Sequence, residues 1–301
     1  MRTFSIKYFL AAVIAAVLLP RVCRAADYNM EDYKPDTNGA GFYVEAVPPA
    51  TQFTAASYFD VLTAPGVPQT LEVEVRSERK QDMLVRVEIG DAYTNPNGLI
   101  CYDAFGKATQ DQGLRLSDMV DFETRIVSVP AGNSVRIPIN ILPPAEPFAG
   151  EVLGGLTFTP VVRMGTQAET EQSSGVRNVF AYSLAVLLRG SAQPVSPRIE
   201  GGQAYAAEDQ GLHKLFYPVR NTAAATLRAS RLNMQVFAHN QDAPVFEVQD
   251  MLVKMAPQSQ TDLQFYLPGN LPLTPGDYRV WTTVDNGEEC WRFESPLTVG
   301  Q

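Results

Sequence analysis

Apolar and polar residues alternate with a period of two along several stretches of this chain. Side chains on a β-strand point in turn to opposite faces, so this alternation predicts strands that bury one face and expose the other. Antiparallel sheets are built from such strands. The stretches with this pattern are 71–76, 85–89, 135–141, 231–236 and 262–267.

Two later stretches, 152–162 and 179–188, are nearly continuous apolar runs. The second run contains β-branched and aromatic residues and is short for a helix, which favours a strand. Turn signals such as Pro65-Gly66 and Asp285-Asn286-Gly287 separate the predicted strands. Short strands with turns about every 8–12 residues are typical of β-sandwiches. The predicted fold class is therefore all-β, with two tandem immunoglobulin-like β-sandwich domains.

The first 25 residues have the layout of a cleaved secretory signal peptide. A basic start precedes a compact apolar run at 10–19, and Cys23-Arg24-Ala25 forms a cleavage site before Ala26. The apolar run is about half of the ~20 residues that a membrane-spanning helix needs. We therefore expect an exported chain.

The mature chain is long enough for two domains, and its composition suggests where they divide. Residues 26–41 are polar and acidic without a period, which predicts a flexible leader. Residues 42–190 form the first predicted sandwich, and 204–301 form the second. The segment between them, 191–203, is rich in proline and glycine and is the predicted linker. The polar stretch 164–175 is expected to be an exposed loop.

The formal net charge of −9 argues against nucleic acid as a partner, because phosphate binding needs clustered Lys and Arg. Of the three cysteines, Cys23 leaves with the signal peptide. Cys101 and Cys290 fall in different predicted domains, so we expect them to remain unlinked.

The sequence contains no arrangement of residues that indicates an enzyme. Its two histidines, His213 and His239, accompany no Gly-x-Ser-x-Gly nucleophile motif. Cys-x-x-Cys and His-Glu-x-x-His zinc motifs are also missing. We therefore predict no catalytic residues, no metal site and no cofactor. The pattern leaves open a calcium ion held between loop carboxylates.

Three aromatic residues stand out in the second predicted domain. Phe216, Tyr266 and Trp281 lie out of phase with the apolar face of their strands. If they are exposed close together, they form a ligand-binding face, because exposed apolar patches mark interaction sites. The alternative is that these rings pack against the neighbouring domain or cover a sheet edge.

An ordered set of segments resembles the WxL-interacting proteins of Gram-positive bacteria. The resemblance runs from about Phe42 to Val299 and rests on the whole set, since no single motif is diagnostic. The segments are 58–102, 148–158 (FAGEVLGGLTF), 178–189 (NVFAYSLAVLLR), 216–221 (FYPVRN), 255–259 (MAPQS) and 273–281 (LTPGDYRVW).

The resemblance implies a non-enzymatic adaptor, secreted and associated with the cell wall or cell surface. The first domain would bind peptidoglycan, and the second would bind a WxL-domain protein or a host surface protein. Members of this family usually end in a transmembrane helix with a basic tail, whereas this chain stops at Gln301. No integral membrane anchor is therefore expected. The alternative function is a chaperone-like or donor-strand-accepting assembly factor for surface proteins.

Overall fold

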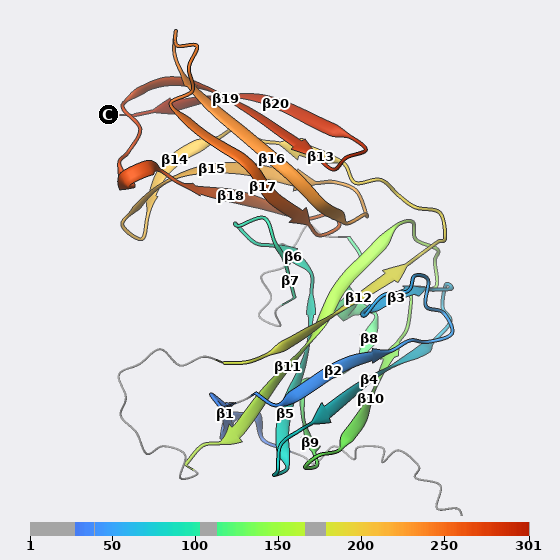
Figure 1. The fold of residues 1–301 in the computed structure, drawn as a ribbon. Coiled ribbons are helices and arrows are strands. Elements are labelled where there is room, and N and C mark those ends of the chain that lie inside the picture. The colour runs from blue at the N-terminus through green and yellow to red at the C-terminus, as the bar shows by residue number, and fades with distance from the viewer. Residues whose placement is uncertain (1–27, 39, 103–112, 166–178, 301) are drawn as a thin grey trace, which may run out of the picture.

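A computed structural model describes residues 28–38, 40–102, 113–165 and 179–300. The predicted signal peptide, 1–25, lies outside these residues, as does most of the 164–175 loop. The described chain forms two β-sandwich domains, one above the other in Figure 1, and contains only short 3-10 helices besides its strands. The all-β prediction is confirmed. Within the same described ranges, no helix is long and apolar enough to cross a membrane.

Two facing sheets make the first sandwich. One sheet has the order β3-β12-β11-β5-β9, and β1 also pairs with β11. The strands are β1 (Tyr33–Pro35), β3 (Phe59–Leu62), β5 (Met83–Asp91), β9 (Arg125–Val129), β11 (Glu151–Arg163) and β12 (Tyr182–Arg189). The second sheet has the order β2-β4-β10-β8. Its strands are β2 (Phe42–Val47), β4 (Gln69–Ser77), β8 (Val120–Asp121) and β10 (Ser134–Ile141).

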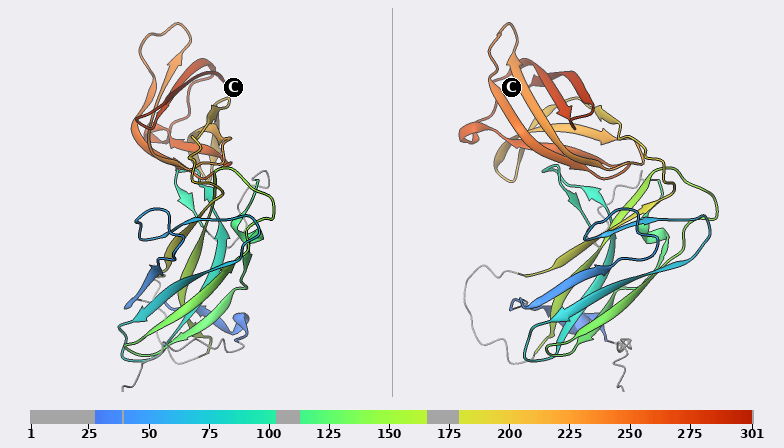
Figure 2. Two further views of the ribbon diagram at one scale, coloured as in Figure 1. Left: turned by 90° about the vertical axis from the view of Figure 1, so that its right-hand side faces the viewer. Right: turned by 45° about the vertical axis from the view of Figure 1, so that its right-hand side comes forward.

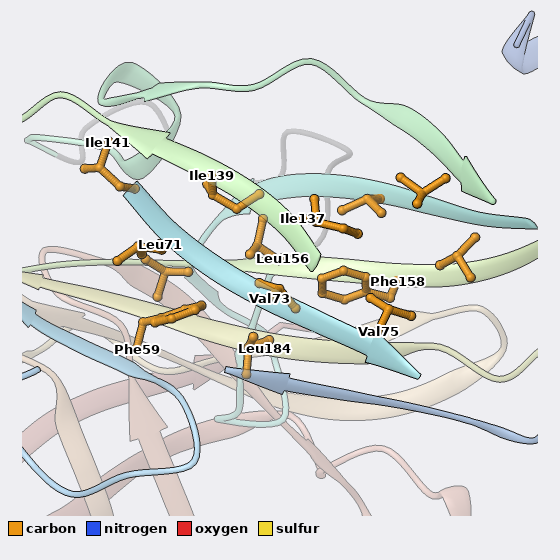
Figure 3. Packing of buried hydrophobic residues seen from close by; sticks show 14 of the residues in the cluster. Phe59, Leu71, Val73, Val75, Ile137, Ile139, Ile141, Leu156, Phe158 and Leu184 are labelled. Atoms are coloured by element: carbon orange, nitrogen blue, oxygen red, sulfur yellow. The ribbon is translucent and has the colours of Figure 1, made fainter. Parts of the chain in front are cut away.

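The core of this domain lies between the two sheets, as Figure 3 shows. Strand β4 contributes Leu71, Val73 and Val75, all fully buried, while Glu72 and Glu74 point the other way. In the antiparallel register, Val73 of β4 lies opposite Ile137 of β10. The alternation in the sequence thus predicts the inward-facing residues of this strand correctly.

The N-terminal segment differs from its prediction. Residues 26–41 were expected to form a flexible leader, but η1 (Met30–Asp32) and β1 lie within them. Strand β1 pairs with the last residues of β11, beyond the part that β12 covers. The Asp36 carboxylate also forms an ion pair with Arg79 at 2.9 Å. The expectation is corrected for residues 30–36, because the long strand β11 supplies a pairing edge that the local sequence does not reveal.

The second sandwich also has two sheets. The first contains β13, β14 and β18, all of which pair with β15, and the second has the order β17-β16-β19-β20. The first sheet comprises β13 (Ile199–Gly201), β14 (Tyr205–Asp209), β15 (Leu212–Asn221) and β18 (Gln260–Tyr266). The second comprises β16 (Leu227–Ala238), β17 (Phe246–Met255), β19 (Gly276–Asp285) and β20 (Cys290–Val299). Helix η4 (Pro268–Asn270) follows β18.

Strand β13 lies inside the segment 191–203, which the sequence predicts as a linker. It pairs with β15, so its residues are part of the second sandwich. Strand β12 ends at Arg189 in the first sandwich, and the residues between it and β13 form no strand. The stretch free of strands is therefore shorter than the predicted linker.

A hairpin of the first domain, β6 (Tyr93–Thr94) and β7 (Ile100–Cys101), reaches the second domain (Figures 1 and 2). Its tip contacts the edges of β17 and β18. The Pro96 carbonyl accepts a hydrogen bond from the Gln264 amide at 2.9 Å, and the Gly98 carbonyl accepts one from the Lys254 amide at 2.8 Å. At the base of the hairpin, the Thr94 and Ser259 hydroxyls lie 2.7 Å apart in a buried contact. The hairpin therefore closes the open side of the second sandwich between its two sheets.

Candidate functional site

The structure separates the three predicted aromatic residues onto two faces. Phe216 on β15 and Tyr266 on β18 share the outer face of one sheet, whereas Trp281 on β19 belongs to the opposite sheet. Their strand neighbours are buried in the core, namely Tyr217, Phe265 and Val280. Because the core lies between the sheets, the outward residues of the two sheets point in opposite directions. The three rings form no common patch, and their part in binding stays a prediction.

Trp281 is the centre of an aromatic and cationic cluster, which we call the Trp281 cluster, made of Phe237, Arg279 and Trp281. Trp281 is 44% exposed, and its ring packs against Phe237 with the ring centroids 5.0 Å apart. The Arg279 guanidinium lies 5.6 Å from the Trp281 ring centroid and 5.9 Å from that of Phe237. Trp and Arg are the residues most enriched at the energetic centres of protein interfaces. The cluster thus has the composition of a protein-binding surface.

Phe216 lies in a groove on the other outer face of the second domain, which we call the Tyr205 groove. It encloses about 590 Å³, and Tyr205, Phe216, Pro218, Arg220 and Asp262 are among its lining residues. The Tyr205 ring stacks on Phe216 with the centroids 5.0 Å apart and the planes 11° apart. The Tyr205 hydroxyl donates a hydrogen bond to the Asp262 carboxylate at 2.7 Å. Desolvation by partial burial, together with Asp262, raises the pKa of Tyr205 to about 12.

Sequence reasoning did not find Tyr205, because the short strand β14 has no clear alternation. The available signal was the pair Gly201-Gly202 just before it. Glycine inside a strand pattern often marks a close approach of another chain segment or a ligand. A Cβ atom on Gly202 would lie 2.8 Å from the Pro218 Cβ. A larger residue at this position would therefore clash with Pro218 and fill part of the groove.

Tyr266 lies beside this groove and covers a buried lysine. The Lys214 ammonium lies 5.1 Å from the Tyr266 ring centroid and forms an ion pair with Asp209 at 2.7 Å. It also donates a hydrogen bond to the Gln264 side chain at 3.1 Å. Tyr266 is itself 57% exposed, so its outer ring face is open for contact.

A third surface, the Tyr102 hollow, lies on the first domain. It sits on the outer face of β5, β11 and β12 beside the β6–β7 hairpin and encloses about 540 Å³. Its lining includes the polar side chains of Thr157, Thr159 and Ser183 and the rings of Tyr93 and Tyr102. Desolvation by burial raises the pKa of the Tyr102 hydroxyl.

Tyr102 owes its position to a glycine of β11. A Cβ atom on Gly155 would lie 2.7 Å from the Tyr102 Cβ, so only glycine lets the tyrosine lie against the sheet. The Tyr102 carbonyl also accepts a hydrogen bond from the Thr157 hydroxyl at 3.2 Å. The glycine-rich part of β11 therefore fixes both the shape of the hollow and the position of the Tyr102 ring.

Cys101 and Cys290 are free, as predicted. Cys101 is half-buried in the first domain and accepts a hydrogen bond from the Asn95 amide group at 3.3 Å. Cys290 is exposed at the start of β20 in the second domain. Among the residues that the structure describes, no group of three or more His, Cys, Asp and Glu side chains is placed to hold a metal ion.

Two family models match the chain in tandem. The model described as "WxL Interacting Protein, peptidoglycan binding domain" matches residues 42–160, and the one described as "WxL Interacting Protein, host binding domain" matches 171–301. The first match covers most of the first sandwich. The second match begins before β12, although β12 pairs within the first sandwich.

No curated protein matches the chain. Among solved structures, the chaperone–tip adhesin complex of CFA/I fimbriae is 12% identical with a TM-score of 0.35, and the match covers 85% of this chain and 99% of that one. The CsuC–CsuE pre-assembly complex of Acinetobacter baumannii is 9% identical with a TM-score of 0.34, covering 76% and 92%. The CupB2 chaperone of Pseudomonas aeruginosa is 15% identical with a TM-score of 0.30, covering 77% and 93%.

Proposed function

Because this chain belongs to the WxL-interacting protein family, we propose that it is a non-enzymatic adaptor at the bacterial cell surface. The observation that supports this function is the tandem match, with a peptidoglycan-binding domain at 42–160 followed by a host-binding domain at 171–301. In this function, the first domain binds peptidoglycan and the second binds a WxL-domain protein or a host surface protein. Both tasks are binding, and neither needs a chemical step.

The Tyr102 hollow is the proposed peptidoglycan site. Glycan strands carry hydroxyl and amide groups around apolar ring faces, and the hollow offers the threonine and serine hydroxyls beside tyrosine rings. Its volume lies within the range of ordinary ligand pockets, which is ~300–1,000 Å³. Strands contribute most of its lining residues, and a rigid sheet is a better scaffold for a specific site than a loop.

The Trp281 cluster is the proposed protein-binding site. A half-exposed Trp beside an Arg gives a large contact area with a charged rim. The cluster and the Tyr102 hollow lie on different domains, so one partner does not block the other. An adaptor needs this arrangement, because it must hold the wall polymer and the protein at the same time.

The function is tested by sedimenting the full chain with purified peptidoglycan sacculi. The wild-type protein should pellet with the sacculi, whereas an assembly factor for surface subunits should stay in solution. Ser183→Gln places a longer side chain in the Tyr102 hollow and should weaken sedimentation about tenfold, or ~1.4 kcal/mol. Ser134→Gln is the matched control, because Ser134 is exposed on β10 in the opposite sheet.

Each outcome bears on a different part of the proposal. A wild-type chain that does not pellet contradicts peptidoglycan binding by this protein. Equal pelleting of both variants, with equal melting temperatures, contradicts the Tyr102 hollow as the site.

A further inference from the structure

We infer that the Tyr205 groove of the second domain is a saccharide-binding site for an uncharged sugar ring. This site goes beyond the proposed function, which assigns protein binding to the Trp281 cluster on the opposite sheet. It also differs from the Tyr102 hollow, which lies on the first domain.

The groove runs between two rows of side chains that cross the sheet. Tyr205, Phe216 and Gln264 are direct neighbours across three strands and form one row. Glu200, Arg220 and Gln260 form the other.

Between these rows lies a low floor. It contains Pro218, with Asp262 opposite it on β18. On the other side of Pro218 is Gly202, which has no side chain and whose amide donates a hydrogen bond to the Pro218 carbonyl at 2.8 Å. The register of these strands therefore creates the groove.

Tyr205 supplies a fixed aromatic platform in this groove. Stacking on Phe216 and the hydrogen bond to Asp262 hold the ring in place, and 41% of the residue is exposed. A pre-ordered ring loses little conformational freedom when a ligand stacks on it. The apolar C–H face of a sugar ring fits such a surface.

The surrounding polar groups match the hydroxyls of a sugar. The Asp262 and Glu200 carboxylates accept hydrogen bonds, the Arg220 guanidinium donates them, and the Gln260 amide does both. Two carboxylates face one guanidinium, so the groove has an excess negative charge and disfavours acidic sugars and phosphates. The ligand class is accordingly a neutral hexose or an N-acetylated hexosamine.

A peptide fits this groove less well. Peptides that join a sheet need a free strand edge, but β15 is paired with β13 and β14 on one side and with β18 on the other. Proline-rich segments dock between several exposed aromatic rings. Here Tyr205 covers Phe216, which leaves one platform rather than a row of them.

The first domain completes the groove. Pro96, at the tip of the β6–β7 hairpin, is one of the lining residues. The neighbouring Asn97 side chain accepts a hydrogen bond from the Gln264 side chain at 2.9 Å. The hairpin therefore orders one end of the site from across the domain boundary.

The test is a titration of the full chain that is monitored by saturation-transfer NMR. The ligands are the methyl glycosides of glucose, galactose, mannose, N-acetylglucosamine and N-acetylgalactosamine. At least one glycoside should bind saturably, with a dissociation constant on the order of 1 mM, as expected for a single ring. Tyr205→Ala should weaken that binding at least tenfold by removing the platform. Tyr205→Phe keeps the ring but lacks the hydrogen bond to Asp262, so it should lose less glycoside affinity than Tyr205→Ala.

Tyr43→Ala is the control, because it removes an exposed aromatic ring from β2 of the first domain and should leave glycoside binding unchanged. Melting temperatures of all variants show whether the fold is kept. The inference is overturned if none of the five glycosides binds, or if a folded Tyr205→Ala variant binds as well as the wild type. Saturable binding of a polyproline peptide without glycoside binding would also overturn it. None of these results depends on sedimentation with sacculi, which tests the proposed function separately.

Discussion

The Glu151 carboxylate accepts two hydrogen bonds from Thr226 across the domain boundary. One comes from the Thr226 backbone amide at 2.8 Å and the other from its hydroxyl at 2.6 Å. Glu151 also forms an ion pair at 2.9 Å with Arg189, which in turn pairs with the buried Asp60. Strands β11, β12 and β3 of the first domain are thereby joined to the start of β16 in the second.

Replacing Glu151 should therefore destabilise the protein. Glu151→Ala leaves the half-buried Arg189 with one carboxylate instead of two and leaves the Thr226 amide without its acceptor. We expect the free energy of unfolding to fall by ~1–3 kcal/mol, the cost of unsatisfied buried groups. Chemical denaturation measures the change, with Glu146→Ala at an exposed position as the control. Equal stability of the two variants would show that the Glu151 contacts contribute nothing.

The hairpin contact predicts a second effect on stability. Gly98 has a positive φ of 71°, and a Cβ atom there would lie 3.2 Å from a Val253 methyl group. Gly132, in a turn of the first domain, has a similar φ of 62° but nothing within 4 Å of such a Cβ. Gly132→Ala thus carries only the backbone penalty, on the order of 1 kcal/mol, and Gly98→Ala adds a steric clash. A larger loss of melting temperature for Gly98→Ala is expected, and equal losses would contradict the close fit of the hairpin.

Domain boundaries can be probed by limited proteolysis. The residues between Arg189 and Ile199 form no strand and include Pro194 and Pro197, so they offer extended backbone to a protease. Proteinase K should cut there or in the 164–175 stretch before it cuts any core strand. Mass spectrometry of the first fragments identifies the sites. First cuts within 71–89 would contradict the strand assignment of β4 and β5.

Much of the fold could be predicted from the sequence, because burial of one strand face leaves a period-two pattern. That pattern correctly places Tyr217, Phe265 and Val280 inward. It cannot say which of two sheets a strand joins, so it grouped Phe216 with Trp281 although they lie on opposite faces. Strand pairing of the short N-terminal segment and docking of the hairpin depend on distant strand edges, which local patterns do not record. The position of Tyr205 over Phe216 is another such tertiary contact.

Alkaline pH should destabilise the second domain through Tyr217. This residue is fully buried, and its hydroxyl lies near that of Thr282 but forms no hydrogen bond of good geometry. Burial raises the pKa of Tyr217 to about 12 from its ordinary value of 10.0. The folded protein then holds the proton more tightly than the unfolded chain, so stability is intact below pH 10 and falls as the pH rises towards 12.

The Tyr217→Phe variant tests whether Tyr217 causes this loss of stability at alkaline pH. It removes the titrating group and the unsatisfied hydroxyl, so its stability near pH 7 should equal or exceed that of the wild type. Its melting temperature should also fall less steeply between pH 10 and 12. A wild-type profile that runs parallel to that of the variant would contradict the assignment.

We predict that a protein partner meets the face of the second domain that carries Trp281. Its ring covers Phe237 on the outer side of the sheet, while Val280 and Thr282 on either side of it face the core. Trp281→Ala should therefore keep the fold and weaken binding of a WxL-domain or host surface protein by ~1–3 kcal/mol, the range of an aromatic anchor. Phe216→Ala and Tyr266→Ala alter the opposite face and serve as the comparison. Melting temperature and partner affinity are measured on all three variants.

If Trp281→Ala lowers stability and leaves affinity unchanged, its ring supports the sheet by shielding Phe237 rather than binding a partner. If Phe216→Ala or Tyr266→Ala alone lowers affinity, the partner binds the face that carries the Tyr205 groove. That result would place protein and saccharide recognition on one surface.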